Sequence, residues 1–330
     1  MLQRRLGANG PLVSAIGLGC MGMSDLYGPS DRAAGVATIR AAIDAGVTLF
    51  DTGDFYGMGD NELLVGEAIK PYRRESILLS VKFGALRDPS GAWTGFDGRP
   101  AAVKNFLAYS LKRLGVDCID IYRPARLDPA VPIEETIGAV ADLVRAGYVR
   151  FIGLSEAGSD TLRRAAAVHP IVDLQIEYGL LSRDIETSIL PTCRELGVSI
   201  TAYGVLGRGL LGGHWTKNRV TSAGDYRALI PRFRAENVER NLQLVEVVRT
   251  VAEAHHVTVA QIAIAWALSR GTDIVPIIGA RRPDQLADAL AAIRVSIEPE
   301  DIVALDRLSG SVCGTRYPAL QMAHLDSEKG

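Results

Sequence analysis

The chain has 330 residues, of which 48% are hydrophobic and 22% charged, as is usual for a globular protein with a large core. Its net charge is −2 and it contains no basic block, which argues against a nucleic-acid-binding surface. No apolar run follows Arg4 and Arg5, and no stretch reaches the roughly 18 apolar residues of a membrane span. We therefore expect a cytoplasmic protein with neither a secretory signal nor a membrane segment.

Cysteine and histidine give no sign of a metal or disulfide framework. The four cysteines lie far apart, with no Cys-x-x-Cys pair and no histidine at ligand spacing: Cys20, Cys118, Cys193 and Cys313. The five histidines are scattered as well, and the pair at 255–256 fits the end of a helix. We expect reduced cysteines and no metal site.

Short apolar runs rich in Val, Ile and Leu alternate with longer amphipathic stretches. Such runs are typical of parallel strands that are buried on both faces. In chain order the expected strands are residues 15–19, 47–50, 77–81, 118–122, 149–153, 172–176, 198–202 and 274–277. Helices are expected at residues 31–45, 61–69, 101–114, 133–146 and 187–196, and all but the second end at a glycine.

Eight strand–helix alternations favour a closed (β/α)₈ TIM barrel over an open doubly wound sheet, with residues 1–330 as a single domain. Residues 17–22 do match the spacing G-x-G-x-x-G of dinucleotide-binding sheets. However, a polar loop follows them where a helix is required, so we interpret them as a strand end and loop. A long insertion at 204–235 is expected to be functional. The tail, 309–330, lacks periodicity and is expected either to cover the barrel mouth or to be mobile.

Reactive side chains of a barrel belong at the C-terminal ends of its strands. Asp51 directly follows the second expected strand, Tyr56 lies in the loop after it, and Lys82 ends the third. Two interpretations remain open on these residues alone. Asp51 and Lys82 could form a salt bridge at the barrel rim. Alternatively, Lys82 could lower the pKa of the Tyr56 phenol, which would then donate a proton to a carbonyl oxygen.

Residues 51–57, Asp-Thr-Gly-Asp-Phe-Tyr-Gly, resemble the D-T-A-x-x-Y-G signature of the aldo-keto reductases, and residues 80–84 resemble their catalytic-lysine strand. Further phrases of that family follow in family order at residues 153–156, 174–178, 203–209 and 278–282. The chain most resembles the perakine reductase-like subgroup and is related to the potassium-channel β-subunits. The resemblance implies an NADPH-dependent oxidoreductase that reduces an aldehyde or ketone, with Tyr56 as general acid and Asp51 and Lys82 as its catalytic partners.

The resemblance also implies a cofactor site for NADPH or NADP. Ser155 and Gln175 would hydrogen-bond the nicotinamide carboxamide, and Tyr203 would stack on its ring. Asp51 also counts as a cofactor neighbour. The backbone would approach the ribose and the pyrophosphate at Cys20, Met21, Gly204, Leu206 and Gly207.

The phosphate end of this site also has support from the residues themselves. Pro283 suits the start of a helix, and Arg281 precedes it, with Gln285 and Asp288 on the same helix face. A helix N-terminus beside a guanidinium suits the 2′-phosphate of NADP. The alternative is a solvent-exposed helix start with ordinary arginines. Gly279 lies in the same family phrase. The family's Glu-Asn pair is Asp288-Ala289 here, so one adenine contact is shortened and another is lost.

The largest departure from the family is Ala125, at the position where the resemblance implies a catalytic histidine. The loss of one proton-transfer partner could slow the reaction by a factor of roughly 10² or more. Arg123 or Arg126 could polarise the carbonyl in its place. Alternatively, both arginines could form structural ion pairs, for example with Asp128 or Asp120.

Two other functions compete with the reductase. One is an NADP-binding regulatory subunit with slow or no turnover. The other makes Lys82 a Schiff-base nucleophile, which Asp51 opposes by favouring the charged amine. As partners we expect a small carbonyl substrate, neither nucleic acid nor membrane, and either a monomer or a homo-oligomer.

Overall fold

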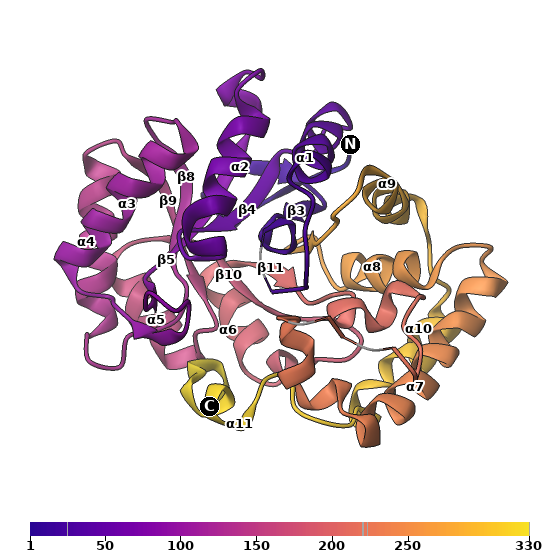
Figure 1. Cartoon of the computed structure of the whole chain (residues 1–330). Helices are drawn as coiled ribbons and strands as arrows, with labels where there is room; N and C mark the ends of the chain where they lie inside the picture. The colour runs from indigo at the N-terminus through magenta and orange to yellow at the C-terminus, as the bar shows by residue number, and fades with distance from the viewer. Residues whose placement is uncertain (25, 220, 223, 330) are drawn as a thin grey trace.

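The computed structural model describes residues 1–24, 26–219, 221–222 and 224–329 of the chain. Within this part, eight parallel strands close a barrel that helices surround (Figure 1). Around the barrel the strands are β3 (Gly17–Gly19), β4 (Leu49–Gly53), β5 (Leu78–Phe83), β8 (Ile119–Pro124), β9 (Val149–Ser155), β10 (Ile171–Glu177), β11 (Ser199–Tyr203) and β12 (Ile274–Ile278). The predicted (β/α)₈ barrel is confirmed.

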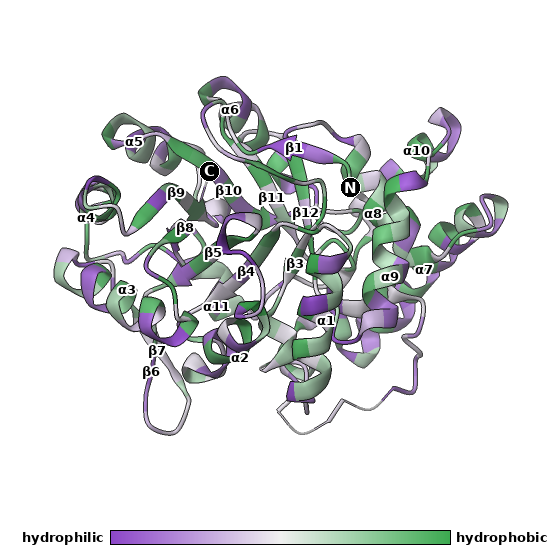
Figure 2. Ribbon diagram, turned by 90° about the horizontal axis from the view of Figure 1, so that it is seen from above, coloured by the Kyte–Doolittle hydropathy of each residue, from purple (hydrophilic) through white to green (hydrophobic). Residues whose placement is uncertain are grey.

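All eight expected strands exist, but several continue further toward their C-terminal ends than the apolar runs suggested. β4 includes Asp51 and ends at Gly53, and β9 includes Ser155. These polar residues are paired to neighbouring strands in regular register, which hydrophobicity alone does not reveal. Figure 2 shows the hydrophobic residues concentrated along the strands, as burial on both faces requires.

The helices around the barrel also follow the expected pattern. Glycines with positive φ end two of them: Gly115 ends α3 and Gly197 ends α6. From α1 to α6 the bounds are Arg32–Asp44, Asp60–Ile69, Pro100–Leu114, Ile133–Arg145, Ser159–Val168 and Ile189–Leu196. From α7 to α11 they are Ala235–Ala254, Val259–Ser269, Pro283–Ala291, Pro299–Asp306 and Ala319–His324. Among the described residues, no helix is long and apolar enough to span a membrane.

Two antiparallel hairpins were not foreseen. β1 (Gln3–Arg5) and β2 (Leu12–Ser14) pair before the barrel begins, and the backbone of Gly7 and Ala8 hydrogen-bonds to the start of β11 and the loop before it. This hairpin therefore closes the N-terminal end of the barrel. β6 (Ala85–Arg87) and β7 (Trp93–Phe96) form the second hairpin, directly after β5.

The barrel interior changes from apolar to polar between its two ends. Six buried hydrophobic side chains pack together near the closed end: Leu6, Val13, Leu49, Ile121, Val172 and Val275. Beyond them, Arg123 is fully buried and its guanidinium contacts the Asp173 carboxylate at 2.8 Å. Arg123 also donates to Ser80 Oγ, which in turn donates to Asp51. A polar layer thus leads from the core to the open end of the barrel.

The segments predicted to be irregular cover the open end. β3 stops at Gly19 and a 3-10 turn follows at Met21–Met23, which confirms the strand-end interpretation of residues 17–22. The 204–235 insertion holds three 3-10 helices, Gly207–Gly212, Tyr226–Leu229 and Pro231–Phe233; positions 220 and 223 lie outside the described residues. In the tail, Arg316 and Tyr317 are buried against the strand ends, so the first of the two expectations for this segment is confirmed.

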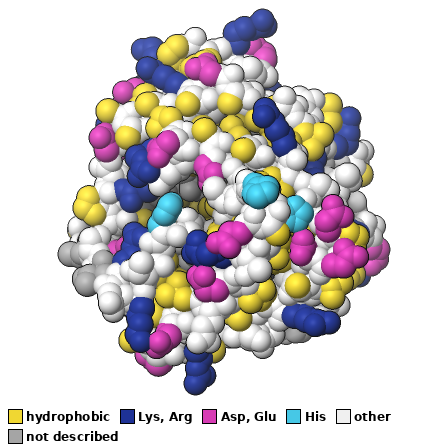
Figure 3. All heavy atoms as spheres, turned by 90° about the vertical axis from the view of Figure 1, so that its right-hand side faces the viewer, with side chains coloured by type: hydrophobic (Ala, Val, Ile, Leu, Met, Phe, Trp, Pro, Cys, Tyr) yellow, Lys and Arg dark blue, Asp and Glu magenta, His cyan; other side chains and the backbone are white. Residues whose placement is uncertain are grey.

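The outer surface is less informative than the barrel mouth. Figure 3 shows the face that carries α7 and α10, where acidic and basic side chains are interspersed with hydrophobic and uncharged atoms. The pair His255 and His256 ends α7, as expected, and His255 Nε2 lies 2.8 Å from Asp301. Neither observation points to a functional site on this face.

Candidate active site

Asp51 and Lys82 meet at the C-terminal ends of β4 and β5, as the sequence predicted. Their side chains form an ion pair that is almost fully buried. Asp51 accepts two further hydrogen bonds through Oδ2, from Ser80 Oγ and from Gln175 Nε2, both at 2.8 Å. Since both carboxylate oxygens are engaged by side chains of two other strands, β5 and β10, the orientation of Asp51 is fixed by the barrel wall.

Tyr56 lies directly beside this pair. Its ring is buried, 5.4 Å from Lys82 Nζ, and makes an edge contact with Phe55 at 4.7 Å between centroids. The following residues, Gly57 and Met58, both have positive φ, so the chain turns sharply after the tyrosine. This tight turn keeps the Tyr56 phenol close to the C-terminal ends of the strands.

The pKa of Tyr56 differs from the expectation. Burial raises it well above the ordinary phenol value and Asp51 adds to the rise, whereas Arg126 opposes it. The prediction that Lys82 lowers this pKa below its usual value is therefore wrong for the protein without a ligand, because desolvation of the phenolate outweighs the nearby cations. The consequence is a phenol that carries its proton throughout the neutral range.

The argument about the charge on Lys82 also needs correction. Burial lowers the pKa of Lys82 to about 8, although the Asp51 carboxylate acts in the opposite direction. Asp51 was expected to keep the ammonium firmly charged, but desolvation is the larger effect. Lys82 remains mostly protonated at pH 7, with part of its population available for deprotonation just above.

The two arginines near the missing histidine have different environments. Arg123 points into the barrel and pairs with Asp173, not with Asp128 or Asp120, which had been suggested as partners. Arg126 lies at the mouth, where it donates to the carbonyl of Ala125 at 2.6 Å and approaches Ser155 Oγ at 3.4 Å. Only Arg126 is therefore placed to act on a bound ligand.

The other implied cofactor residues of the early strands gather around the same centre. The backbone amide of Cys20 donates to the carbonyl of Asp51 at 2.9 Å, and Met21 follows in the 3-10 turn. Ser155 and Gln175 are direct neighbours in the β9–β10 register. Gln175 is already bonded to Asp51, so these polar groups form one continuous surface beside Tyr56.

The end of β11 supplies the next group. Tyr203 closes the strand, and Gly204 and Gly207 follow with φ of +70° and +55°. A Cβ at Gly204 would lie 2.8 Å from the Glu177 side chain, so only glycine fits this turn. Between the two glycines, Leu206 is partly buried and precedes the first 3-10 helix of the insertion. Gly204 is likewise partly buried, whereas Gly207 is buried.

The proposed phosphate end is assembled around the start of α9. Gly279 follows β12, and Pro283 occupies the first turn of the helix. The Arg281 amide donates to Gln285 Oε1 at 3.0 Å, and its guanidinium donates to the carbonyls of Tyr27 (3.1 Å) and Pro29. These contacts join α9 to the loop after β3.

Asp288 lies apart from that group. Its carboxylate accepts from Gln261 Nε2 at 2.8 Å and from Thr258 Oγ1, the residue that caps α8. The carboxylate is thus engaged with the neighbouring helix. The structure brings Arg281 and Gln285 together at the helix start, but it gives Asp288 a structural partner.

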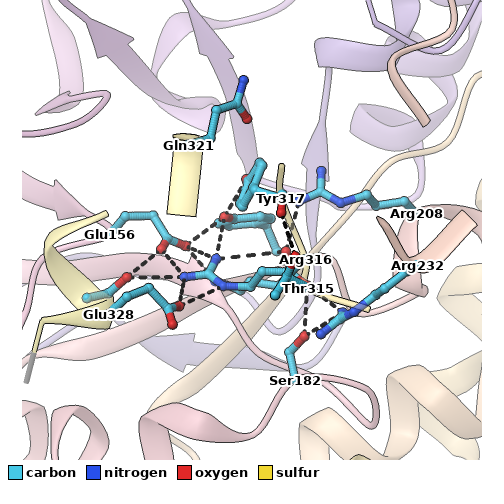
Figure 4. A network of polar contacts seen from close by, with 12 residues as sticks. Glu156, Ser182, Arg208, Arg232, Thr315, Arg316, Tyr317, Gln321 and Glu328 are labelled. Atoms are coloured by element: carbon cyan, nitrogen blue, oxygen red, sulfur yellow. Dashed lines mark hydrogen bonds and ion pairs between the residues drawn. The ribbon is translucent and has the colours of Figure 1, made fainter. Parts of the chain in front are cut away.

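The polar network that holds the tail was not predicted from the sequence. Arg316 lies between Glu156 and Glu328, with N–O distances of 2.6 and 2.7 Å, and Tyr317 lies beside it (Figure 4). Tyr203 donates to Glu156 at 2.6 Å, and the Tyr203 and Tyr317 hydroxyls are 2.8 Å apart. Because the tail is aperiodic, no local pattern could have placed it against β9 and β11.

Within this network, the neighbouring arginine charges outweigh the effect of burial on the pKa of Glu156. Burial alone would raise the pKa of Glu156, but the Arg316 and Arg126 charges bring it down to about 2. Glu156 also has a positive φ of 52°, a conformation that costs free energy in a residue other than glycine. The tail is therefore fixed by specific charged contacts over the barrel mouth.

Comparison with known proteins agrees with this geometry. The profile described as "Aldo/keto reductase family" matches residues 15–309. The "Probable aldo-keto reductase 1" of Glycine max is 42% identical over 321 residues, covering 95% of this chain and 91% of that protein. The NADP(+) aldo-keto reductase yakc of Schizosaccharomyces pombe is 39% identical over 312 residues, covering 93% and 92%.

Solved structures support the same assignment. The glycerol dehydrogenase AKR11B4 from Gluconobacter oxydans has a TM-score of 0.84 at 26% identity and covers 98% of this chain and 96% of its own. The aldo-keto reductase AKR11C1 from Bacillus halodurans, solved in its holo form, has a TM-score of 0.75 at 26% identity, with 97% and 99% covered. Since the profile spans most of the chain and curated relatives match along nearly its full length, the chain belongs to the aldo/keto reductase family of oxidoreductases.

Proposed function

We propose that this protein is an NADPH-dependent carbonyl reductase that converts an aldehyde or ketone to an alcohol, with Tyr56 as the general acid. The observation that carries the proposal is the buried phenol of Tyr56 beside the Asp51–Lys82 ion pair, at the open end of the barrel. A phenol in this position can give its proton to a carbonyl oxygen and regain it from solvent or from Lys82.

The residues at the mouth fit a nicotinamide cofactor. The turn that begins at the partly buried Gly204, with its positive φ and no side chain, offers backbone that a pyrophosphate can approach. Ser155 and Gln175 offer side-chain polar groups for an amide, and Tyr203 offers a ring face. At the other end, Arg281 and the first turn of α9 suit a phosphate. When bound, the reduced cofactor supplies the hydride that the carbonyl carbon receives.

The residues of the chain supply the proton for the carbonyl oxygen and orient the carbonyl group. Tyr56 holds its proton at neutral pH because its pKa is raised, so it begins the reaction as a donor. Lys82 is positioned to stabilise the phenolate that forms and to return a proton to it, and Asp51 holds Lys82 in place through their ion pair. Ala125 leaves out the imidazole that the family resemblance implies, so the Tyr56 phenol must orient the carbonyl oxygen without it.

The proposal is tested by steady-state oxidation of NADPH and of NADH with a panel of aldehydes and ketones. The wild-type protein is expected to oxidise NADPH, and Tyr56→Phe to lose roughly 10²–10⁴-fold in kcat. The binding of NADPH to Tyr56→Phe, followed by fluorescence, should be unchanged. An unchanged rate in Tyr56→Phe contradicts the proposal. Tight NADPH binding with no turnover of any carbonyl supports a regulatory subunit instead.

One observation supports a second candidate, a Schiff base on Lys82. The lowered pKa of this lysine, about 8, increases the fraction of neutral amine. The ion pair with Asp51 works against it, and we rank this function below the reductase. Borohydride treatment with benzaldehyde, without cofactor, should give no adduct on Lys82 in a peptide digest; a stoichiometric adduct would favour the second candidate.

A further inference from the structure

Arg126 differs in its partners from four other cations at the barrel mouth. Each of those four pairs with a carboxylate: Lys82 with Asp51, Arg208 with Glu177, Arg232 with Glu177 and Arg316 with Glu156. Among the described residues, none places a carboxylate within ion-pair distance of Arg126. Its guanidinium donates only to neutral oxygens, those of Ala125, Tyr317 and Ser155.

This arrangement leaves part of the binding capacity of Arg126 unused. A guanidinium that is partly removed from water is costly unless an anion compensates it. Arg123, three residues earlier, shows the compensated case, since it is fully buried against Asp173 at 2.8 Å. The Tyr317 hydroxyl accepts from Arg126 at 3.2 Å, whereas the Glu156 carboxylate acts on Arg126 only at longer range, because it forms its ion pair with Arg316.

Arg126 also forms part of a pocket of about 400 Å³ between the β8–α4 loop, α5 and the tail. Phe96 and Leu127 contribute apolar surface, and His324 and Lys329 come from the tail. The carboxylates of the pocket's two acidic residues accept hydrogen bonds from backbone amides: Asp128 accepts from Gly98, and Asp326 accepts from Gly158. A volume of this size suits a small organic molecule.

We propose that Arg126 binds a carboxylate of the carbonyl substrate, so that the preferred substrates are small oxo acids. This inference rests on the proposed reductase function and names its substrate class. A planar guanidinium holds a carboxylate through two parallel hydrogen bonds, which fixes orientation as well as charge. Arg126 approaches Ser155 Oγ at 3.4 Å, and Ser155 pairs in register with Gln175, which donates to Asp51, so a carboxylate held by Arg126 lies on the same rim of the barrel as the proton donor.

The carboxylate takes no part in the reaction. The carbonyl carbon accepts a hydride from NADPH, its oxygen accepts the Tyr56 proton, and the product is a hydroxy acid with NADP released. Arg126 is thus a specificity residue. If it acted instead by polarising the carbonyl, its removal would slow acidic and neutral substrates alike.

A matched pair of substrates separates these two roles: 4-formylbenzoate and its methyl ester, which differ chiefly in the charge. Wild type is expected to prefer the acid in kcat/KM at saturating NADPH. Arg126→Gln should reduce kcat/KM for the acid by roughly 10- to 100-fold, the worth of a charge-assisted hydrogen bond, and leave the ester nearly unchanged. Arg126→Lys should recover part of the loss, because it restores the charge without the planar fork.

Arg163→Gln is the matched control. Arg163 pairs with Glu195 on the outer face of α5, away from the pocket, so its loss removes one positive charge without touching the site. It should leave the preference for the acid intact. If Arg163→Gln and Arg126→Gln reduce that preference equally, the effect is one of net charge and the proposal is overturned.

A binding measurement tests the proposed carboxylate site without requiring turnover. Isothermal titration of benzoate into the cofactor-free protein should show binding to wild type and clearly weaker binding to Arg126→Gln, with benzamide as the neutral comparison. Equal benzoate binding by both proteins overturns the proposal, as does an equal loss of rate on acid and ester. If no aldehyde is reduced but benzoate binding depends on Arg126, the reductase function fails while the anion site stands.

Discussion

Two ion-pair systems lie at the open end of the barrel, and they are held in different ways. The Asp51–Lys82 pair joins adjacent strands, and the β4–β5 register fixes both side chains. The Glu156–Arg316 pair joins β9 to the tail, where residues 315–318 have no regular structure. The comparison indicates that the proposed reaction centre lies on the rigid wall of the barrel, whereas a few charged contacts hold the tail over the mouth.

Removing the cation of each pair tests this comparison directly, and the larger effect on activity is expected at the barrel wall. Lys82→Met should reduce kcat by roughly 10²–10⁴-fold, because the phenolate of Tyr56 loses its stabilising partner. Steady-state kinetics with NADPH and benzaldehyde measures the loss. NADPH binding should persist, and a circular dichroism melt serves as the control for folding, since Asp51 is left buried without its partner.

Arg316→Met is the matching change in the tail. Breaking a buried ion pair by removing one partner costs about 3–5 kcal/mol, and here we expect that cost to appear as local release of the tail. Hydrogen exchange should show lost protection across residues 315–329 while the barrel strands remain protected. The effect on kcat should be smaller than that of Lys82→Met. A global loss of protection would show that the tail is part of the barrel's cooperative unit.

Ala125→His tests whether the proposed active site on the barrel wall lacks only one proton-transfer group. Ala125 is buried at the end of β8, and its amide donates to the carbonyl of Phe83 at 2.8 Å, so the backbone there is fixed. Restoring an imidazole should raise kcat on benzaldehyde by up to roughly tenfold, a fraction of the full contribution of a positioned acid. No gain, with folding intact, would indicate that Arg126 and its neighbours have reorganised the site.

Asp54→Asn should give the smallest effect and a gain in stability. Burial, and then the neighbouring Glu62, raise the pKa of Asp54 to about 8, and its Oδ1 is buried without a hydrogen-bond partner among the described residues. The folded state therefore holds a proton that the unfolded chain releases near pH 4, and stability falls as pH rises from there toward 8.

Replacing the carboxyl with an amide removes this titration, so stability should increase by on the order of 1 kcal/mol at pH 8. Urea unfolding at several pH values measures it. The dependence on pH between 4 and 8 should become weaker in the variant than in wild type. An unchanged slope would mean that Asp54 is ionised in the folded protein and that the buried neighbour Glu62 dominates the titration.

Much of the fold and the reactive centre could be predicted from local patterns. The apolar runs identified all eight strands because a barrel strand buried on both faces needs an almost continuous apolar sequence. The place of Asp51 and Lys82 at one rim of the barrel could be predicted because both stand at the ends of such runs. The catalytic interpretation with Tyr56 was favoured over a rim salt bridge only through the resemblance to the aldo-keto reductases. The direction of the Tyr56 pKa shift could not be predicted, since it depends on burial by residues from the whole mouth.

The sequence by itself determined the barrel and the order of its strands, because these follow from periodicity within single segments. The C-terminal limits of the strands depend on pairing with their neighbours, so the structure set them. The tertiary structure alone decided that Arg123 pairs with Asp173, that Arg316 and Tyr317 cover the mouth, and that Arg126 has only neutral partners there. Each of these depends on which distant segments meet. Contacts of this kind are set by chain packing and leave no local signature in the sequence.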